Sequence, residues 1–325
     1  MAIIPYIQFF QPEFQKIENA LRSIIDKNSS IFSKLAQRAI NSGGKRIRPL
    51  LFLIAQELVK GKIVEDSEYA ACCFELLHCA SLLHDDVIDD ASSRRGKPTI
   101  NAEFGDKTSI LLGDYLFLHS FLNILRPEFN VLMPVLLQTL EKMIEGEGLE
   151  LEYRGNINIS EEDCFRINKL KTSILFENAC KGGAMLCEAS NEQIKAITKF
   201  GLNLGCAFQL VDDVLDYIGN HKELGKPILN DFKEGKATIP LVITLQSATE
   251  SEKTFLQEQF EISSEKAIQS DRILEIMRQY NAFNQVLLKA KALATDAVEE
   301  IQIFENNENV KYLKQITNFI ITRNL

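Results

Sequence analysis

Two short acidic patterns have the side-chain chemistry and the spacing needed to bind a metal ion. Both read D-D-x-x-D, and they hold Asp85, Asp86 and Asp89, and Asp212, Asp213 and Asp216. Residues i and i+4 lie on one face of a helix, so the first and last aspartates of each pattern point the same way and repel one another. Carboxylate oxygens suit Mg²⁺, which binds one or two protein carboxylates together with substrate phosphate oxygens.

One such pattern is as readily a solvated helix end as a site. Two copies, each after a strongly apolar helical run, favour metal binding instead. If the two carboxylate faces are opposed across a helical bundle, they build a metal-rich mouth over an apolar interior. The predicted metal ligands are Asp85, Asp86, Asp89, Asp212 and Asp216.

Basic residues near these patterns could bind phosphate groups. The run Gly43-Gly44-Lys45-Arg46-Ile47-Arg48-Pro49 is a loop-to-helix junction, where a proline suits the first helical turn and the helix N-terminus attracts anions. Lys45 and Arg48 could hold a phosphate there. Arg94-Arg95-Gly96 is a second candidate anion site, unless these arginines pair with neighbouring acidic side chains. Lys171, Lys226 and Lys236 are by default solvated surface residues.

The elements that must position these residues are predicted to be helices almost throughout. Apolar residues at three- and four-residue spacing predict long helices over 66–90, 106–125, 129–152, 160–187 and 191–218. Shorter helices are predicted over 10–26, 30–41, 49–60, 236–247, 250–262, 270–280, 283–304 and 308–323. No strand alternation is convincing, and Gly219 to Thr238 is predicted to be a mobile basic loop. The fold class is therefore all-α, as one domain over 1–325.

Composition limits the remaining possibilities. The chain has 325 residues, a formal charge of −9, 46 % apolar and 25 % charged residues, which excludes a disordered chain and disfavours nucleic-acid binding. The seven cysteines form no C-x-x-C pair and lie in apolar stretches, so they are predicted to be reduced and buried in a cytoplasmic protein. No signal peptide and no membrane anchor are expected.

Taken in order, the motifs resemble those of the trans-isoprenyl diphosphate synthases, the polyprenyl synthetase family, and are octaprenyl diphosphate synthase-like. The resemblance covers residues 43 to 240, with a compatible helical tail. It rests on Gly44-Lys45-Arg46-x-Arg48-Pro49, Leu82-Leu83-His84-Asp85-Asp86-x-x-Asp89, Arg94-Arg95-Gly96, Gly113-Asp114, Gly146-Glu147, Lys171-Thr172, Phe208-Gln209-x-x-Asp212-Asp213-x-x-Asp216 and Gly235-Lys236-x-Thr238.

The resemblance implies a helical bundle of the isoprenoid synthase type with a central apolar cavity, and it implies a homodimer, which is the family's usual assembly. It also implies that Asp85, Asp89 and Asp212, with Lys171, are catalytic and that Asp86 and Asp216 support Mg²⁺ binding. An allylic diphosphate would be held by Arg94, Lys171, Thr172, Gln209, Lys226 and Lys236. The diphosphate of isopentenyl diphosphate would be held by Lys45, Arg48, His78 and Arg95.

The expected reaction is a head-to-tail condensation. The allylic diphosphate departs and leaves a carbocation, the double bond of isopentenyl diphosphate attacks it, and a proton is lost with the released diphosphate as base. Two departures from the family pattern stand out. Many relatives have Gln where this chain has Glu150, which adds a negative charge, and the residues before Lys171-Thr172 are less typical.

Small residues one helical turn before Asp85 favour a medium- or long-chain product. Ala80 and Ser81 are expected to leave a tunnel open where bulky aromatics would close it, and replacing either by Phe is expected to shorten the product. Alternatively, Leu77, Phe117 or Phe121 forms the floor and the enzyme is a short-chain farnesyl or geranylgeranyl diphosphate synthase. A class I terpene cyclase and a non-catalytic synthase subunit are the other readings.

Overall fold

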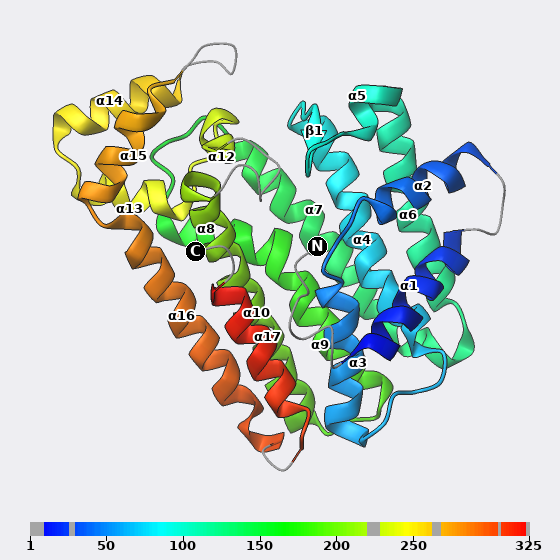
Figure 1. The fold of residues 1–325 in the computed structure, drawn as a ribbon. Helices are drawn as coiled ribbons and strands as arrows, with labels where there is room; N and C mark the ends of the chain where they lie inside the picture. Colours follow the sequence, from blue (N-terminus) through cyan, green and yellow to red (C-terminus); the bar gives the residue numbers. More distant parts are fainter. Residues whose placement is uncertain (1–9, 26–29, 220–227, 262–267, 305–306, 323–325) are drawn as a thin grey trace. The chain divides into compact units, whose positions relative to one another are not determined.

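The computed structural model describes residues 10–25, 30–219, 228–261, 268–304 and 307–322. Its elements in chain order are α1 (Gln11–Ile25), α2 (Ile31–Asn41), α3 (Ile47–Lys60), α4 (Ser67–Ile88), β1 (Ser93–Arg94), β2 (Lys97–Pro98), α5 (Ile100–Phe104), α6 (Asp106–Ile124), the 3₁₀-helix η2 (Pro127–Leu132), α7 (Met133–Tyr153), α8 (Glu161–Asn168), the π-helix η3 (Lys169–Ser173), α9 (Ile174–Leu186), α10 (Asn191–Ile218), α12 (Asn230–Lys233), α13 (Ile239–Ser247), α14 (Glu250–Phe260), α15 (Ser270–Gln279), α16 (Ala282–Glu300), the 3₁₀-helix η4 (Ile301–Phe304) and α17 (Val310–Thr322). The predicted all-α class is confirmed (Figure 1).

Two compact units divide the chain. Unit 1 consists of Met1–Glu141, Leu175–Gly201 and Val298–Ile316, and unit 2 consists of Lys142–Ile174, Leu202–Ala297 and Thr317–Leu325. Each unit is described separately below. The interpretation of the whole chain as one domain stays a prediction.

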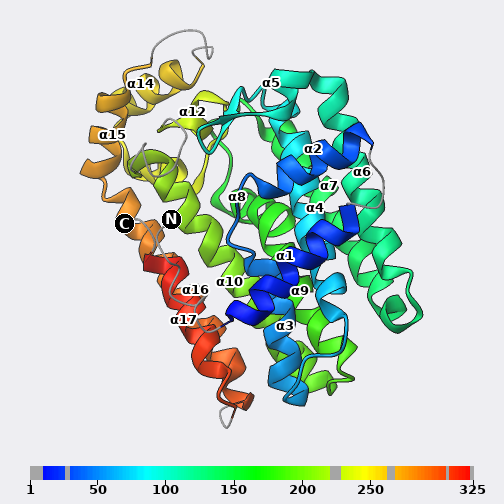
Figure 2. The same cartoon turned by 45° about the vertical axis from the view of Figure 1, so that its right-hand side comes forward.

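Unit 1 is built around α4, the helix that carries the first aspartate pattern. α4 packs against α6, α3 and α1, and Figure 2 shows α1 and α2 beside it as Figure 1 does. α3 is buried over nearly its whole length, and the rings of Phe52 and Phe74 lie 5.8 Å apart between α3 and α4. Gly183 of α9 lets that helix approach α3, because a Cβ atom there would lie 2.1 Å from the carbonyl oxygen of Phe52.

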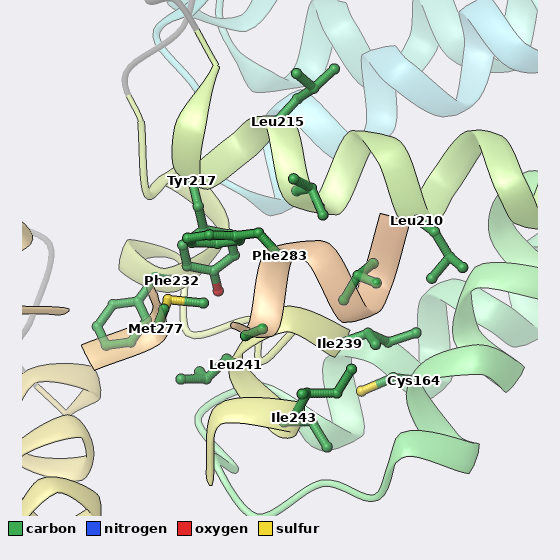
Figure 3. Close-up of a cluster of buried hydrophobic side chains, with 14 of the residues drawn as sticks. Cys164, Leu210, Leu215, Tyr217, Phe232, Ile239, Leu241, Ile243, Met277 and Phe283 are labelled. Carbon is green, nitrogen blue, oxygen red and sulfur yellow. The ribbon is translucent and has the colours of Figure 1, made fainter. Parts of the chain in front are cut away.

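Unit 2 has its own buried apolar cluster, which includes Leu210, Leu215 and Tyr217 from the part of α10 that carries the second aspartate pattern (Figure 3). The ring of Tyr217 at the end of α10 lies 5.9 Å from that of Phe283, and the ring of Phe232 lies 5.1 Å edge-on to that of Phe260. Met277 lies beside the aromatic side chains in Figure 3. This cluster packs against the apolar face of the C-terminal part of α10 and holds it in place.

The five long helices predicted from apolar spacing are confirmed, except that residues 129–132 of the predicted helix 129–152 belong to the 3₁₀-helix η2, and two further differences occur. The segment 160–187 is interrupted by the π-helix η3. The second difference is a small antiparallel hairpin, which pairs Ser93 with Pro98 and Arg94 with Lys97 and corrects the expectation that the chain has no strands. Its two turn residues, Arg95 and Gly96, both have positive φ (52° and 71°), as a two-residue hairpin turn requires.

Candidate active site

The first aspartate pattern lies at the C-terminal end of α4. Asp85 and Asp86 are in its last turn and Asp89 caps the helix, with its N–H donating to the Asp85 carbonyl at 2.8 Å. The C-terminal end of a helix carries the negative pole of the helix dipole, so three carboxylates there produce a potential that attracts cations. Asp85 and Asp89 are partly exposed, whereas Asp86 is buried.

Asp86 already has a cationic partner. Its Oδ1 accepts a hydrogen bond from Arg94 Nε at 2.8 Å, and Asn101 donates to its backbone carbonyl. Burial raises the pKa of Asp86, while the ion pair with Arg94 opposes that rise. Arg94 therefore pairs with an acidic neighbour in this structure, and its role in binding a diphosphate stays a prediction.

His84 positions this end of α4 against α6. Its Nε2 lies 3.0 Å from the Ile110 carbonyl oxygen and 3.5 Å from Asp114 Oδ1. Gly113 makes room for the ring, since a Cβ atom there would lie 2.2 Å from His84 Nε2. The pair Gly113-Asp114 therefore serves the placement of the aspartate helix.

Arg46 is a structural residue that the sequence analysis assigned no role. It is buried, and its guanidinium donates to Glu18 at 2.7 Å, to Glu75 at 2.9 Å and to the Ile40 carbonyl at 2.7 Å. Its φ of 49° is left-handed, and a Cβ at Gly44 would lie 2.8 Å from its Nη1. The sequence signal was its place between Lys45 and Arg48, whereas its partners come from α1, α2 and α4.

His78 lies among the arginines of unit 1. Burial lowers its pKa well below the usual value, and Arg48, Arg95, Arg94 and Arg46 lower it further through their positive charge. His78 is therefore neutral near pH 7, so the positive potential around it comes from the guanidinium groups. An anion placed there would meet several cations and a neutral imidazole.

The structure brings together most of the residues predicted for the second diphosphate. Arg48 is buried with its guanidinium 5.0 Å from the centre of the Phe176 ring. Arg95 donates from the hairpin turn to the Gly43 carbonyl, and burial followed by the charge of Arg94 lowers its pKa. Lys45 is partly exposed at the start of the same junction. The loop-to-helix junction of residues 43–49, the hairpin turn and α4 thus come together within unit 1.

The second aspartate pattern lies near the end of α10 and is built differently. Only Asp212 is partly exposed; Asp213 and Asp216 are buried. Asp216 Oδ2 accepts a hydrogen bond from the Asp231 N–H at 3.1 Å, and its carbonyl accepts one from the Leu229 N–H at 2.8 Å. The carboxylate predicted as a supporting metal ligand therefore holds the start of α12 in this structure.

Asp213 is the centre of an amide network that the sequence analysis did not identify. Gln209 Nε2 donates to its Oδ1 at 2.9 Å, and Asn168 Nδ2 donates to its Oδ2 at 3.2 Å. Burial raises the pKa of Asp213 to about 8. Thr172 Oγ1 in turn donates to Gln209 Oε1 at 2.8 Å, so two predicted substrate-binding residues are held in one orientation. The i, i+4 spacing of Gln209 and Asp213 was the available signal.

Lys171 and Thr172 lie on the π-helix η3, a local widening that often marks functional sites. α7 approaches this turn closely because residue 146 is glycine. A Cβ there would lie 2.7 Å from Leu170 Cβ and 2.9 Å from the backbone nitrogen of Lys171. Lys171 Nζ lies 2.6 Å from Glu147 Oε2 and 2.6 Å from Glu150 Oε1. The Gly146-Glu147 motif thus brings the Glu147 carboxylate into an ion pair with the lysine of the Lys171-Thr172 motif, and Glu150 adds a second carboxylate.

Lys236 reaches the same carboxylates from the segment after α12. Its Nζ lies 3.5 Å from Glu150 Oε1 and 2.9 Å from Glu234 Oε2. Glu150, Lys236, Asp213 and Asn168 all line a cavity of about 40 Å³ in unit 2. Lys226 lies outside the described residues. In the described part of the predicted basic loop, 228–238, backbone hydrogen bonds such as Gly155 N–H to Gly235 O at 2.8 Å fix the chain.

The two predicted length-determining residues differ in exposure. Ala80 is fully buried, while Ser81 is partly exposed and its Oγ donates to the His78 carbonyl at 2.9 Å. Ser81 is one helical turn from Asp85 on the same face of α4. Of the pair, Ser81 therefore has the exposure that a position beside a growing chain requires.

Across the described residues, no group of three or more His, Cys, Asp or Glu side chains is placed to hold a metal ion on its own. In each unit the donors suit Mg²⁺ bound together with phosphate oxygens, because Asp85 and Asp89 in unit 1 and Asp212 in unit 2 have partly exposed carboxylates. In the same part of the chain, no single helix is long and apolar enough to cross a membrane, although α6 and the segment from η2 through α7 pass the length and composition test together with a bend of 115°.

Comparison with known proteins agrees with the motif resemblance. A family model described as polyprenyl synthetase matches residues 29–277. The geranylgeranyl diphosphate synthase of Saccharolobus solfataricus is 31 % identical over 325 residues, covering 97 % of each chain. The octaprenyl diphosphate synthase of Haemophilus influenzae is 32 % identical over 324 residues, covering all of this chain and 98 % of its own.

Solved structures show the same fold. A polyprenyl synthase from Caulobacter crescentus, crystallised with calcium and isoprenyl diphosphate, has a TM-score of 0.92 at 29 % identity and covers 98 % of this chain and 97 % of its own. A decaprenyl diphosphate synthase from Rhodobacter capsulatus has a TM-score of 0.91 at 29 % identity, with 99 % of each chain covered. These relatives differ in the length of the products that they are named for.

Proposed function

This chain belongs to the polyprenyl synthetase family and is a prenyl diphosphate synthase, a transferase, and on that premise we propose that it condenses isopentenyl diphosphate with an allylic diphosphate such as farnesyl diphosphate in a Mg²⁺-dependent reaction. The observation that carries the proposal is the exposure of the aspartates. Asp85, Asp89 and Asp212 are partly exposed, while Asp86, Asp213 and Asp216 are buried with protein partners. The carboxylates open to a ligand are those that the family resemblance assigns to catalysis.

In this proposal Asp85 and Asp89 on α4 and Asp212 on α10 hold Mg²⁺, with Asp86 and Asp216 in support. When bound, Mg²⁺ neutralises the diphosphate and stabilises it as a leaving group. Asp86 supports the site by fixing Arg94 at 2.8 Å, and Asp216 supports it by fixing the segment that leads to Lys236. Both buried aspartates therefore act on neighbouring cationic residues.

The allylic diphosphate is assigned to Arg94, Lys171, Thr172, Gln209, Lys226 and Lys236. Within unit 2, the hydrogen bonds from Thr172 to Gln209 and from Gln209 to Asp213 orient the amide and hydroxyl groups before substrate arrives. Preorganised donors stabilise charge that develops on a leaving group without reorganisation during the reaction. Lys171 contributes here as a catalytic cation on the departing diphosphate.

The diphosphate of isopentenyl diphosphate is assigned to Lys45, Arg48, His78 and Arg95. The lowered pKa of His78 supports this, because a group that stays neutral among arginines can donate an N–H without adding repulsion to the cationic cluster. Arg48 is oriented by the Phe176 ring and Arg95 by the Gly43 carbonyl. These side chains hold the second substrate while its double bond reacts.

The chemistry follows from these assignments. The C–O bond of the allylic diphosphate breaks and leaves an allylic carbocation and a diphosphate anion. The π electrons of isopentenyl diphosphate form the new C–C bond to that carbocation, and the resulting cation loses a proton to the released diphosphate. No side-chain base is required. Apolar helix walls have to exclude water, which would otherwise capture the carbocation.

Incubating the purified protein with farnesyl diphosphate, isopentenyl diphosphate and Mg²⁺ tests this function. Elongated prenyl diphosphates, identified by chromatography and mass spectrometry, are the expected products. Loss of diphosphate with formation of a cyclic hydrocarbon would identify a class I terpene cyclase instead. An inactive, folded protein would favour a non-catalytic synthase subunit.

We further propose a medium- or long-chain all-trans product, in preference to the short-chain alternative. Ser81 supports this because its small, partly exposed side chain lies one turn from Asp85. Ser81→Phe is expected to shorten the product by several isoprene units, while Ser81→Ala, which stays small, keeps the wild-type length. Product sizing with the same substrates measures both, and an unchanged length in Ser81→Phe would refute this assignment.

We also propose that the protein is a cytoplasmic homodimer. Three leucines on one side of α6 (Leu111, Leu118 and Leu122) and Leu125, the residue that ends this helix, are each at least half exposed, from 50 % to 58 %. Such a leucine row typically packs against another surface. Six of the seven cysteines are buried free thiols, as a reducing compartment favours. Light scattering coupled to size-exclusion chromatography is expected to give twice the chain mass.

A further inference from the structure

Glu150 is the shared partner of two lysines on different segments of unit 2. A single oxygen, Oε1, lies 2.6 Å from Lys171 Nζ and 3.5 Å from Lys236 Nζ. Lys171 comes from the π-helix η3 and Lys236 from the segment after α12, so Glu150 on α7 links two elements that are otherwise separate in sequence. All three side chains are mostly shielded, with 18 %, 19 % and 13 % of their surface exposed.

Among the described residues, three carboxylates lie within 3.5 Å of the two lysine ammonium groups. Glu147 and Glu234 add their carboxylates at 2.6 Å from Lys171 and 2.9 Å from Lys236, so three carboxylates surround two ammonium groups. Shielding from solvent strengthens these ion pairs relative to fully exposed ones. Lys171 and Lys236, two of the residues assigned to the allylic diphosphate, are therefore each paired with protein carboxylates in this structure.

We propose that Glu150 competes with the allylic diphosphate for Lys171 and Lys236 and thereby sets the affinity for that substrate. The inference rests on the proposed function, because it takes the ligand of the two lysines to be a diphosphate. A diphosphate that binds both ammonium groups must displace Glu150 Oε1 or share the lysines with it. In either case the negative charge of Glu150 opposes the incoming anion.

Glu150 also bears on the release of the diphosphate product. The same lysines hold the diphosphate after the C–O bond breaks, and an anion that binds too tightly leaves slowly. A carboxylate that takes the lysines back favours departure of the released diphosphate. Glu150 is thus a positioning residue that acts through Lys171 and Lys236.

The variant Glu150→Gln tests the competition because it keeps the side-chain shape and removes the charge. We expect the KM for farnesyl diphosphate to fall by about tenfold, the value of one charge-assisted hydrogen bond. The inhibition constant of inorganic diphosphate, measured with Mg²⁺ present, falls by a similar factor. The KM for isopentenyl diphosphate stays within twofold, and kcat does not rise.

Glu145→Gln is the matched control. Glu145 is on the same helix, is exposed, and pairs with Lys142 at 2.7 Å and Arg166 at 3.6 Å, away from the two lysines. It is expected to leave both KM values unchanged. Glu150→Ala carries the same prediction as Glu150→Gln if the amide variant does not fold.

The outcomes separate this inference from the proposed function. If the wild-type protein makes no elongated product, the function is wrong. If the wild type is active but the KM for farnesyl diphosphate in Glu150→Gln is unchanged or higher, the competition is refuted. An equal fall in both KM values refutes it too, because that would be a general effect of charge on anionic substrates.

Discussion

The same five-residue acidic pattern is built in two different ways in this molecule. In unit 1 the pattern meets the end of α4, so Asp89 caps the helix and stays partly exposed. In unit 2 the helix α10 continues to Ile218. Asp216 therefore lies inside its last turn, where it is buried and accepts a hydrogen bond from the Asp231 N–H. An identical spacing thus gives a ligand-accessible carboxylate in one place and a structural one in the other.

The cations around the two patterns differ as well. In unit 1, arginines gather around the neutral His78, and burial, followed by the positive charge of Arg94, lowers the pKa of Arg95. In unit 2, Lys171 and Lys236 are matched by Glu147, Glu150 and Glu234. Under the proposed function, unit 1 would bind an anion directly at its arginines, whereas an anion in unit 2 would compete with protein carboxylates for the two lysines.

The largest expected effect comes from exchanging the third aspartate of each pattern. Asp89→Ala is expected to lower kcat by about 10²–10³-fold, because it removes a group that stabilises the leaving diphosphate. Its free energy of unfolding should fall by less than that of Asp216→Ala, because Asp89 is partly exposed whereas Asp216 is buried. Steady-state kinetics and urea unfolding measure both.

Asp216→Ala should behave in the opposite way. It leaves the Asp231 N–H without its acceptor and is expected to lower the free energy of unfolding by about 1–3 kcal/mol. Its loss of activity should appear mainly as a higher KM for the allylic substrate, through the segment that carries Lys236. Equal effects of the two variants on stability would remove the distinction between the patterns.

A smaller effect is expected at the glycines of α7. Gly146→Ala places a Cβ 2.9 Å from the backbone nitrogen of Lys171 and should lower the free energy of unfolding by about 1–3 kcal/mol. Gly148→Ala meets no atom within 4 Å and should raise it by about 0.5–1 kcal/mol, the helix propensity difference. Thermal or urea unfolding of the pair measures whether the close approach to η3 is required; a stable Gly146→Ala would show that it is not.

The smallest effect is a pH dependence from His78. The folded protein keeps this imidazole neutral, whereas the unfolded chain takes up a proton below the ordinary pKa of 6.5. Stability is therefore lost as the pH falls below that value, by at most about 1.4 kcal/mol per pH unit from this group. His78→Asn should show a shallower decline between pH 6.5 and 5.5 in urea unfolding. The same decline in both proteins would contradict the assignment.

Much of the fold could be predicted because apolar spacing is a local property. The helices over 66–90, 106–125 and 191–218 match α4, α6 and α10 to within a few residues. The hairpin at Ser93–Pro98 was not predicted, since it depends on left-handed φ at Arg95, a residue type with no preference for it. The π-helix at Lys169–Ser173 also has no signal in apolar periodicity.

The residue types of the site could be predicted from the sequence. Which of these side chains are exposed to a ligand and which are buried with protein partners could not. Asp89 is partly exposed and Asp216 is buried because the two helices end at different positions in the pattern. Asp216 also accepts a hydrogen bond from Asp231, which is fifteen residues away in the chain. The partners of Glu150 come from two other segments, so its charge was visible in the sequence while its contacts were not. Tertiary packing decides which carboxylates remain available to a ligand.

Prenyl transfer by the double variant Asp85→Asn/Asp212→Asn tests the central claim most directly. Purified wild-type and variant proteins are incubated with farnesyl diphosphate, labelled isopentenyl diphosphate and Mg²⁺, and the products are sized by chromatography. The wild type is expected to give elongated prenyl diphosphates, and the variant, folded by circular dichroism, is expected to give none. Elongation by the variant at a rate close to wild type would contradict the assignment of the exposed aspartates to catalysis.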